Sequence, residues 1–211
     1  MIESVNDEGG ARVVELTGIP CVGKSTYISF NNYHTIDELL DSSIIMNNAF
    51  YLFDLIKSGA TPSLSIYDAF WLLRSSMKVR GSLFTKLNIF RNCILKFAYY
   101  SYLSNRQKSK EDIVIDEGIS HIPFLLQDQI NGHQVIEEFY SRFSDQLSCV
   151  SVVCLNADVD TIERLKSRGH KRLKSYSHDE VKKFNDMNKR TLEGIIRHSD
   201  RYKYFSMVAI E

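Results

Sequence analysis

The sequence has no excess of charge of either sign, and it has no apolar run long enough to cross a bilayer. Its 211 residues contain 26 Lys and Arg and 26 Asp and Glu, so the formal net charge at pH 7 is zero. Non-specific nucleic-acid binding depends on clustered positive charge, and this balance argues against it as the main task. Because the chain also lacks a recognisable signal peptide, we expect no membrane span and a cytoplasmic location.

Cysteine and histidine are few, and their spacing does not suit a metal site. The four cysteines are Cys21, Cys93, Cys149 and Cys154. We expect all four to be reduced thiols. Cys21 either replaces a small residue in its loop or has a redox role, and no other residue supports the second option. The six histidines are expected to be ordinary surface or capping residues.

The most informative stretch is residues 13–26, which read VVELTGIPCVGKST. Its apolar start predicts a short buried strand, and the next residues fit the pattern G-x-x-x-x-G-K-[ST]. Gly18 and Gly23 allow backbone angles and close approach that a side chain would block. The turn then directs successive N–H groups at one point, which suits the oxygens of a phosphate. An accidental match is the alternative, but the strand ahead of the loop counts against it.

Each residue of this loop has an expected role in binding ATP and Mg²⁺. Lys24 brings a full positive charge to the β- and γ-phosphates. Ser25 offers a hydroxyl to Mg²⁺, which keeps most of its waters and takes few protein ligands. The residues expected to contact the phosphates are Gly18, Ile19, Pro20, Cys21, Val22, Gly23, Lys24, Ser25 and Thr26.

Patterns of strands and helices alternate along the chain. Residues 1–10 are expected to be a flexible terminus. Apolar runs predict strands at 113–115, 150–155 and 204–210, with a weaker one at 33–36. Helices are predicted at 24–30, through most of 37–103, at 134–143, and from the capping box at Ser177 to about 198. This alternation predicts an α/β fold in one domain over residues 1–211, with a mainly parallel sheet and helices on both faces.

Within residues 37–103, local signals predict where two helices begin and end. Thr61 and Pro62 are typical of an N-cap followed by the first helical residue, and Gly81 suggests the end of that helix. The next helix has a one-face apolar stripe at steps of four and three, made of Leu83, Leu87, Phe90, Ile94 and Phe97. The aromatic residues of this region are expected mostly in the core, with base stacking as the alternative.

Two acidic residues follow the predicted strand at 113–115. Ligands of parallel sheets bind at the carboxyl ends of the strands, where Asp116 and the glycine loop should meet. Asp116 is therefore expected to hold Mg²⁺, directly or through water. Glu117 is either a general base or water-orienting residue, or a solvated loop residue.

Residues 164–174 read RLKSRGHKRLK and are strongly basic. One interpretation is a solvated helix end that complements the helix dipole. The other is a lid over the triphosphate, because phosphoryl transfer needs cationic stabilisation and arginine matches phosphate geometry. Arg164 and Arg168 are four residues apart and would share a helix face. We favour the lid, and a nucleic-acid patch is the less favoured rival.

Together these features resemble the nucleoside and nucleotide kinases of the P-loop class, above all the thymidylate kinase-like and deoxynucleoside kinase-like branches. The loop GIPCVGKST and residues 155–172, LNADVDTIERLKSRGHKR, carry the resemblance. It covers about 13–30 and 111–172. It implies a three-layer P-loop NTPase sandwich with a helical acceptor-site insertion at 37–103. It also implies that lid arginines contact ATP phosphates, a role carried onto Arg164, Arg168 and Arg172.

The sequence departs from these branches on the acceptor side. An arginine usually follows the acid at the end of the core strand, whereas Glu117 occupies that place here. The usual acidic residue after the second strand is also missing, and Asp37 and Glu38 are the nearest candidates for an acceptor base. Arg74 and Arg80 are the candidates for holding an acceptor phosphate.

Three functions remain open from the sequence. The first is an ATP-dependent kinase of a nucleoside, a nucleotide or a related metabolite. The second is a P-loop ATPase or switch that acts with a protein partner, suggested by the acid pair Asp116 and Glu117. The third is a regulatory module that only binds nucleotide. A small-molecule acceptor is the expected partner, and a homodimer is left open.

Overall fold

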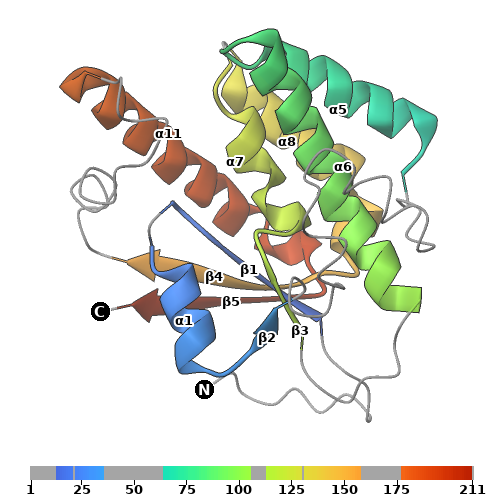
Figure 1. Cartoon of the computed structure of the whole chain (residues 1–211), viewed down its shortest axis with the longest axis vertical. Coiled ribbons are helices and arrows are strands. Elements are labelled where there is room, and N and C mark those ends of the chain that lie inside the picture. Colours follow the sequence, from blue (N-terminus) through green and yellow to red (C-terminus); the bar gives the residue numbers. More distant parts are fainter. Residues whose placement is uncertain are drawn as a thin grey trace.

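A sheet of five parallel strands in the order β2-β3-β1-β4-β5 forms the centre of the protein (Figure 1). The computed structural model describes residues 13–20, 22–35, 64–105, 113–129, 131–157 and 177–210. The strands are β1 (Val13–Gly18), β2 (His34–Thr35), β3 (Ile113–Asp116), β4 (Ser151–Ala157) and β5 (Tyr204–Ile210). The helices are α1 (Lys24–Phe30), α5 (Ile66–Lys78), α6 (Leu83–Asn105), α7 (Ile122–Leu126), α8 (Gly132–Arg142), α9 (Ser144–Leu147) and α11 (His178–Arg197), with short 3₁₀ turns η1 (Ile119–His121) and η2 (Ser199–Arg201).

The register of the central strands brings the ends of β1 and β3 together. Leu16 of β1 lies opposite Asp116 of β3, and Gly18 lies opposite Leu155 of β4. The backbone N–H of Glu117 donates to the carbonyl of Leu16 at 3.0 Å, which continues the pairing past the end of β3. The loop after β1 and the turn after β3 therefore lie side by side at the carboxyl ends of the strands.

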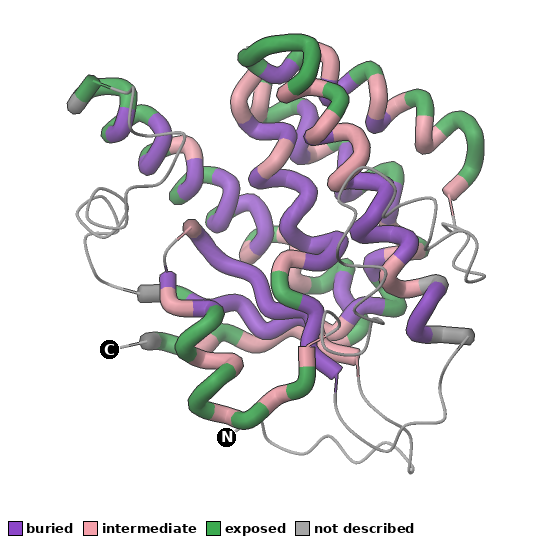
Figure 2. The backbone as a smooth tube through the Cα atoms, in the orientation of Figure 1, coloured by how far each residue is buried: buried purple, intermediate pink, exposed green. Residues whose placement is uncertain are grey.

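Helices cover the two faces of the sheet unequally. Parallel crossovers are right-handed, so connections that move in opposite directions across a sheet lie on opposite faces. The connection from β1 through α1 to β2 moves one way, whereas those through α6, α7–α8 and α11 move the other way. Figure 1 accordingly shows α1 on one side and the larger helical layer on the other. Successive β1 residues Glu15, Leu16 and Thr17 are all buried, as expected for a strand covered on both faces (Figure 2).

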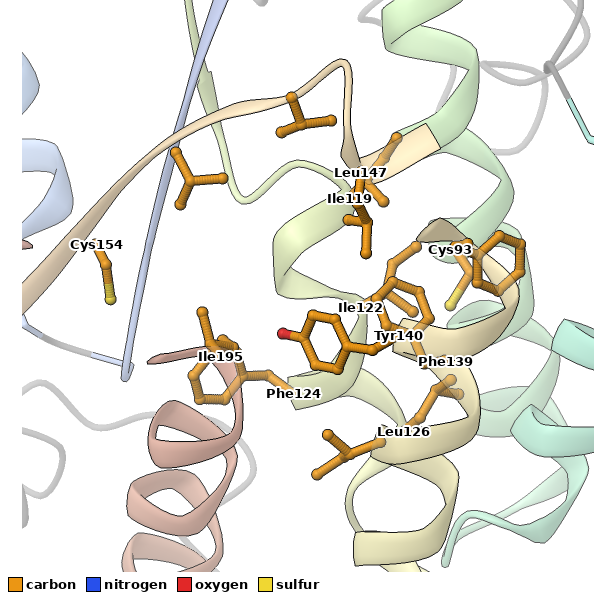
Figure 3. Packing of buried hydrophobic residues seen from close by; sticks show 14 of the residues in the cluster. Cys93, Ile119, Ile122, Phe124, Leu126, Phe139, Tyr140, Leu147, Cys154 and Ile195 are labelled. Atoms are coloured by element: carbon orange, nitrogen blue, oxygen red, sulfur yellow. The ribbon is translucent and has the colours of Figure 1, made fainter. Parts of the chain in front are cut away.

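The main core lies between the sheet and the larger helical layer. Aromatic rings of α8 and the residue after it are among its largest buried side chains, and Phe139 lies 5.1 Å from Phe143 between ring centroids. Phe97 of α6 also lies 5.1 Å from Phe143. Figure 3 shows Phe139 and Tyr140 of α8 in one cluster with Ile122 and Leu126 of α7. Packing of α6, α7 and α8 on one another therefore holds the segment that follows β3.

The structure confirms the α/β alternation and most predicted elements, and it corrects two details. The helix predicted to begin at Thr61 and Pro62, which lie outside the described residues, begins at Ile66. Its cap is Ser65, whose hydroxyl accepts the backbone N–H of Asp68 at 3.1 Å. The apolar stripe of α6 is buried only in its second half. Two of the aromatics expected in the core, Tyr67 and Phe70, are exposed. The exposed aromatic and aliphatic side chains of this helical pair are Ile66, Tyr67, Phe70, Leu83, Phe84 and Leu87.

None of the helices in the described residues combines the length and the apolar character needed to span a bilayer. The longest of them, α6, carries the buried Lys96. The next longest, α11, has a strongly charged outer face that includes exposed Lys182, Lys183 and Asp186. This finding agrees with the absence of a bilayer-length apolar run in the sequence.

The capping box predicted at the start of α11 is present in full. Ser177 Oγ accepts the N–H of Glu180 at 3.3 Å, and a Glu180 carboxylate oxygen accepts the N–H of Ser177 at 2.7 Å. We predict that Ser177→Ala lowers the free energy of unfolding by about 1 kcal/mol, because the substitution leaves a helix N–H without its acceptor. Urea unfolding measures this change. Glu180→Gln retains an acceptor and should cost less, so an equal or larger loss in that variant would contradict the account.

Candidate functional site

The loop after β1 has the backbone shape that its glycines predict. Gly18 has a φ of 147° and Gly23 a φ of 105°, both in the region that favours glycine. A Cβ atom on Gly18 would also lie 2.6 Å from the carbonyl oxygen of Leu155 on β4. Between them the N–H of Val22 donates to the carbonyl of Ile19 at 3.2 Å, which closes a tight turn. Sterics therefore fix the route of the chain from β1 to Lys24.

Lys24 is buried at the start of α1, with its ammonium group directed back toward the end of β1. Its side chain is only 8% exposed, and Nζ donates to the carbonyl of Gly18 at 3.4 Å. Nζ also lies 3.1 Å from Oε1 of Glu117, in the turn after β3. A buried charge is costly unless it is paired. The Glu117 carboxylate is therefore the group that compensates Lys24 in this structure.

Glu117 is held by its backbone as well as by its side chain. Its φ is 62°, a left-handed conformation that is uncommon for residues other than glycine. Its backbone N–H donates to the carbonyl of Leu16, and its carbonyl accepts a hydrogen bond from Nζ of Lys96 on α6. The side chain therefore belongs to a cluster of charges, and it also keeps contact with solvent, since it is 39% exposed.

The charges around Glu117 keep it ionised. Burial alone would raise the pKa of its carboxyl group, but nearby positive charge outweighs burial and lowers the pKa to about 2. His121 would contribute to this effect only if protonated, and burial lowers the pKa of His121 to about 3. His121 is therefore neutral at pH 7, and Lys24 and Lys96 are the cations that stabilise the carboxylate at that pH.

Glu15 is a fully buried carboxyl group in the middle of β1 that the sequence interpretation missed. Its two oxygens accept the backbone N–H groups of Ile119 and Ser120 at 2.6 and 2.7 Å. Burial raises its pKa, and these hydrogen bonds oppose the rise. Gly118 leaves the space that Glu15 needs, since a Cβ atom there would lie 2.2 Å from the carboxyl carbon. A glutamate within the apolar run VVEL was the available signal.

His121 and Lys96 were also missed. His121 is 5% exposed, so the prediction that all six histidines are surface or capping residues is wrong for it. Its Nε2 lies 3.4 Å from Oε2 of Glu117, and its ring stacks on Phe124 with centroids 4.8 Å apart. Burial lowers the pKa of Lys96, and nearby acids, Glu117 and Glu15 foremost, oppose this effect. Both residues become recognisable only once α6 and the turn after β3 are placed against β1.

The residues expected to hold Mg²⁺ also lie at the carboxyl ends of the strands. Asp116 is the exposed last residue of β3, opposite Leu16, and Ser25 is exposed in the first turn of α1. No group of three or more His, Cys, Asp or Glu side chains within the described residues could hold a metal ion. Mg²⁺ keeps several waters and needs only one or two protein oxygens. A hydroxyl and an accessible carboxylate at one edge therefore fit this ion.

The remaining candidates fall into two groups. Arg74 and Arg80 are exposed on the helical pair α5–α6, and Arg80 lies at the connecting turn with its Nε 3.9 Å from Oδ1 of Asp128. Figure 1 places this turn at the end of the helical layer away from the sheet. The second group lies outside the described residues and comprises Cys21, Asp37, Glu38, Arg164, Arg168 and Arg172. Their roles stay predictions.

Three comparisons with known proteins give no match. No protein-family model matches the sequence. No curated protein matches the chain, and no solved structure matches it.

The contact between Glu15 and Gly118 generates a stability prediction. Gly118→Ala should lower the free energy of unfolding by about 1–3 kcal/mol, because its methyl group would overlap the Glu15 carboxyl group. Glu15→Asp shortens the side chain and should relieve part of this overlap. In urea unfolding, the double variant should therefore lose less stability than the sum of the two single variants. Additivity within about 0.5 kcal/mol would show that the two groups do not interact.

The burial of neutral His121 generates a pH prediction. Its pKa is about 3 in the folded protein against an ordinary value of 6.5, so the unfolded chain binds the extra proton. This contribution to stability is complete above pH 6.5 and is lost as the pH falls toward 3. Urea unfolding at several pH values measures this change. As the pH falls from 6.5 toward 3, the unfolding free energy of the wild type should decrease relative to that of His121→Gln. A difference that does not change with pH would contradict the buried neutral imidazole.

Proposed function

We propose that the protein is an ATP-dependent kinase that transfers the γ-phosphoryl group to a nucleoside, a nucleotide or a related metabolite. The observation that carries this proposal is the position of Lys24. Its buried ammonium group lies at the end of β1, close to Gly18 and 3.1 Å from Glu117, the residue that follows Asp116 and the end of β3. A fixed cation next to a glycine turn and an accessible carboxylate is the arrangement that phosphoryl transfer from ATP requires.

Each part of this edge has a role in the proposed reaction. The loop 18–25 and Lys24 would bind the β- and γ-phosphates, since preorganised cations stabilise the charge of the transition state. Ser25 and Asp116 would hold Mg²⁺, which supplies further positive charge to the phosphates. Arg164, Arg168 and Arg172 would close over the triphosphate as a lid. Catalysis would then depend mainly on positioning and on electrostatic stabilisation.

The fold supports the same proposal at a coarser level. The connection after β1 runs along the sheet toward β2, whereas the connection after β4 runs in the opposite direction, toward β5. Ligands of open parallel sheets bind outside the carboxyl ends of the strands at such a switch point. We therefore assign the chain to the three-layer P-loop sandwich of the nucleoside and nucleotide kinases, with residues 37–103 as the region of the acceptor.

A second candidate function, ATP hydrolysis coupled to a protein partner, is favoured by one observation. Glu117 is fixed beside Lys24, where a carboxylate could orient a water molecule against the γ-phosphate. In a kinase the same carboxylate would receive the proton of the acceptor hydroxyl. The two functions differ in whether product formation depends on an acceptor. A module that binds nucleotide without turnover is the remaining alternative.

We predict that Lys24→Ala abolishes acceptor phosphorylation. The wild type and the variant would each be incubated with Mg·ATP and a pool of nucleosides, nucleoside monophosphates, sugars and cell-extract metabolites. Mass spectrometry should then detect a species heavier by one phosphoryl group with the wild type alone. Lys189→Ala, which removes an exposed charge from α11, is the matched control and should retain full activity.

The same assay separates the alternatives. Unchanged phosphorylation by Lys24→Ala would refute the kinase proposal. Release of ADP and free phosphate without an acceptor product, lost in Glu117→Gln, would favour the ATPase. Stoichiometric ATP binding without turnover in the presence of the whole pool would favour the regulatory module.

A further inference from the structure

The two oxygens of the Glu117 carboxylate have different partners. Oε1 lies 3.1 Å from the ammonium group of Lys24, which belongs to the proposed phosphate loop. Oε2 lies 3.4 Å from Nε2 of His121, which is the last residue of η1 and directly precedes α7. The carboxylate is therefore held from two directions by two parts of the fold.

Binding of a nucleotide would affect these two partners differently. A phosphate oxygen at the loop would compete with Glu117 for Lys24, because both are anions and one ammonium group has a limited number of donors. The contact with His121 would remain, since no charge on the imidazole attracts the phosphate. Burial and the stack on Phe124 restrict the movement of the ring. His121 is thus the partner that stays when Lys24 turns to the phosphates.

The protonation of the ring follows from its surroundings. His121 is neutral, and Nδ1 is buried without a hydrogen-bond partner among the described residues. If Nδ1 carried the hydrogen, a buried donor would be unsatisfied and the lone pair of Nε2 would face a carboxylate. Both are unfavourable. The hydrogen therefore resides on Nε2, which directs a donor at Oε2 of Glu117.

On the basis of the kinase function proposed above, we propose that His121 is a positioning residue that keeps the Glu117 carboxylate at the reaction site while Lys24 binds phosphate. The 3.4 Å contact shortens to a hydrogen bond when Lys24 leaves, as contacts at reaction sites often do on substrate binding. Lys96 and Leu16 hold the Glu117 backbone at the same time. The acid is then fixed for a role toward the acceptor hydroxyl or a water molecule.

The first test is a spectroscopic one and needs no acceptor. In protein labelled with ¹⁵N-histidine, the His121 ring signals are those that disappear in His121→Gln. At pH 7 they should show the neutral tautomer with hydrogen on Nε2, and this tautomer should persist when Mg·ATP is added. Hydrogen on Nδ1, or a change of tautomer on addition of Mg·ATP, would overturn the inference.

The second test separates positioning from packing. Glutamine can place an N–H near the position of Nε2, whereas methionine fills similar space without a donor. His121→Met should lower the kcat of acceptor phosphorylation by roughly 10- to 100-fold and leave the affinity for Mg·ATP unchanged. His121→Gln should retain most of the wild-type kcat. Equal losses in the two variants, or no loss in either, would show that the donor does not matter.

Failure of the inference and failure of the proposed function give different results. If Mg·ATP shifts backbone signals of the loop 18–25 in uniformly ¹⁵N-labelled protein but the His121 tautomer changes, the nucleotide site stands and the positioning role does not. If Mg·ATP shifts no signal in the wild type, both the proposed function and the role of His121 are refuted.

Discussion

The structure depends on a buried carboxylate that joins two neighbouring strands at their ends. Glu15 of β1 accepts the N–H groups of Ile119 and Ser120, which follow β3. A carboxyl group is costly to bury, and these short hydrogen bonds are what offset that cost. They also leave room for only a glycine at position 118. The turn after β3 is therefore fixed against β1, and Glu117 is placed opposite Lys24.

Because this turn is fixed, a cluster of ionisable groups gathers at the carboxyl ends of β1 and β3. Lys24 and Lys96 balance the charge of Glu117, while burial keeps His121 neutral. Glu117 also retains a left-handed backbone conformation, which costs of order 1–3 kcal/mol for such residues unless the surroundings impose it. Strained backbone and perturbed pKa values gather at functional sites more often than elsewhere. The proposed reaction accounts for this arrangement. In it, Lys24 binds a phosphate, and Glu117 either accepts a proton or orients a water molecule.

The parts that could be predicted from sequence are those set by neighbouring residues. The glycine pattern around Lys24, the apolar strand at 150–155 and the capping box at Ser177 are local signals, and the structure contains all three conformations. The start of α5 was misplaced because Thr61 and Ser65 both have the chemistry of an N-cap. The hydrogen bond from the N–H of Asp68 identifies Ser65 as the cap of α5.

The inner half of the candidate site could not be predicted because it depends on long-range contacts. Glu15 and Ser120 are separated by 105 residues, and Lys96 contacts a carbonyl 21 residues away. No periodicity within one element indicates such pairs. His121 resembled a surface residue because η1, which contains it, packs against β1 and α6, and these elements are distant in sequence.

The central claim is that the loop between β1 and α1 binds the phosphates of a nucleotide through Lys24. Isothermal titration calorimetry of the wild type, Lys24→Ala and Lys189→Ala with Mg·ATP tests it most directly. The account predicts one binding site in the wild type, equal affinity in Lys189→Ala, and affinity weaker by roughly 100-fold or more in Lys24→Ala, because a charge-assisted contact to phosphate is lost. Equal affinity in all three proteins, or no binding to the wild type, would contradict it.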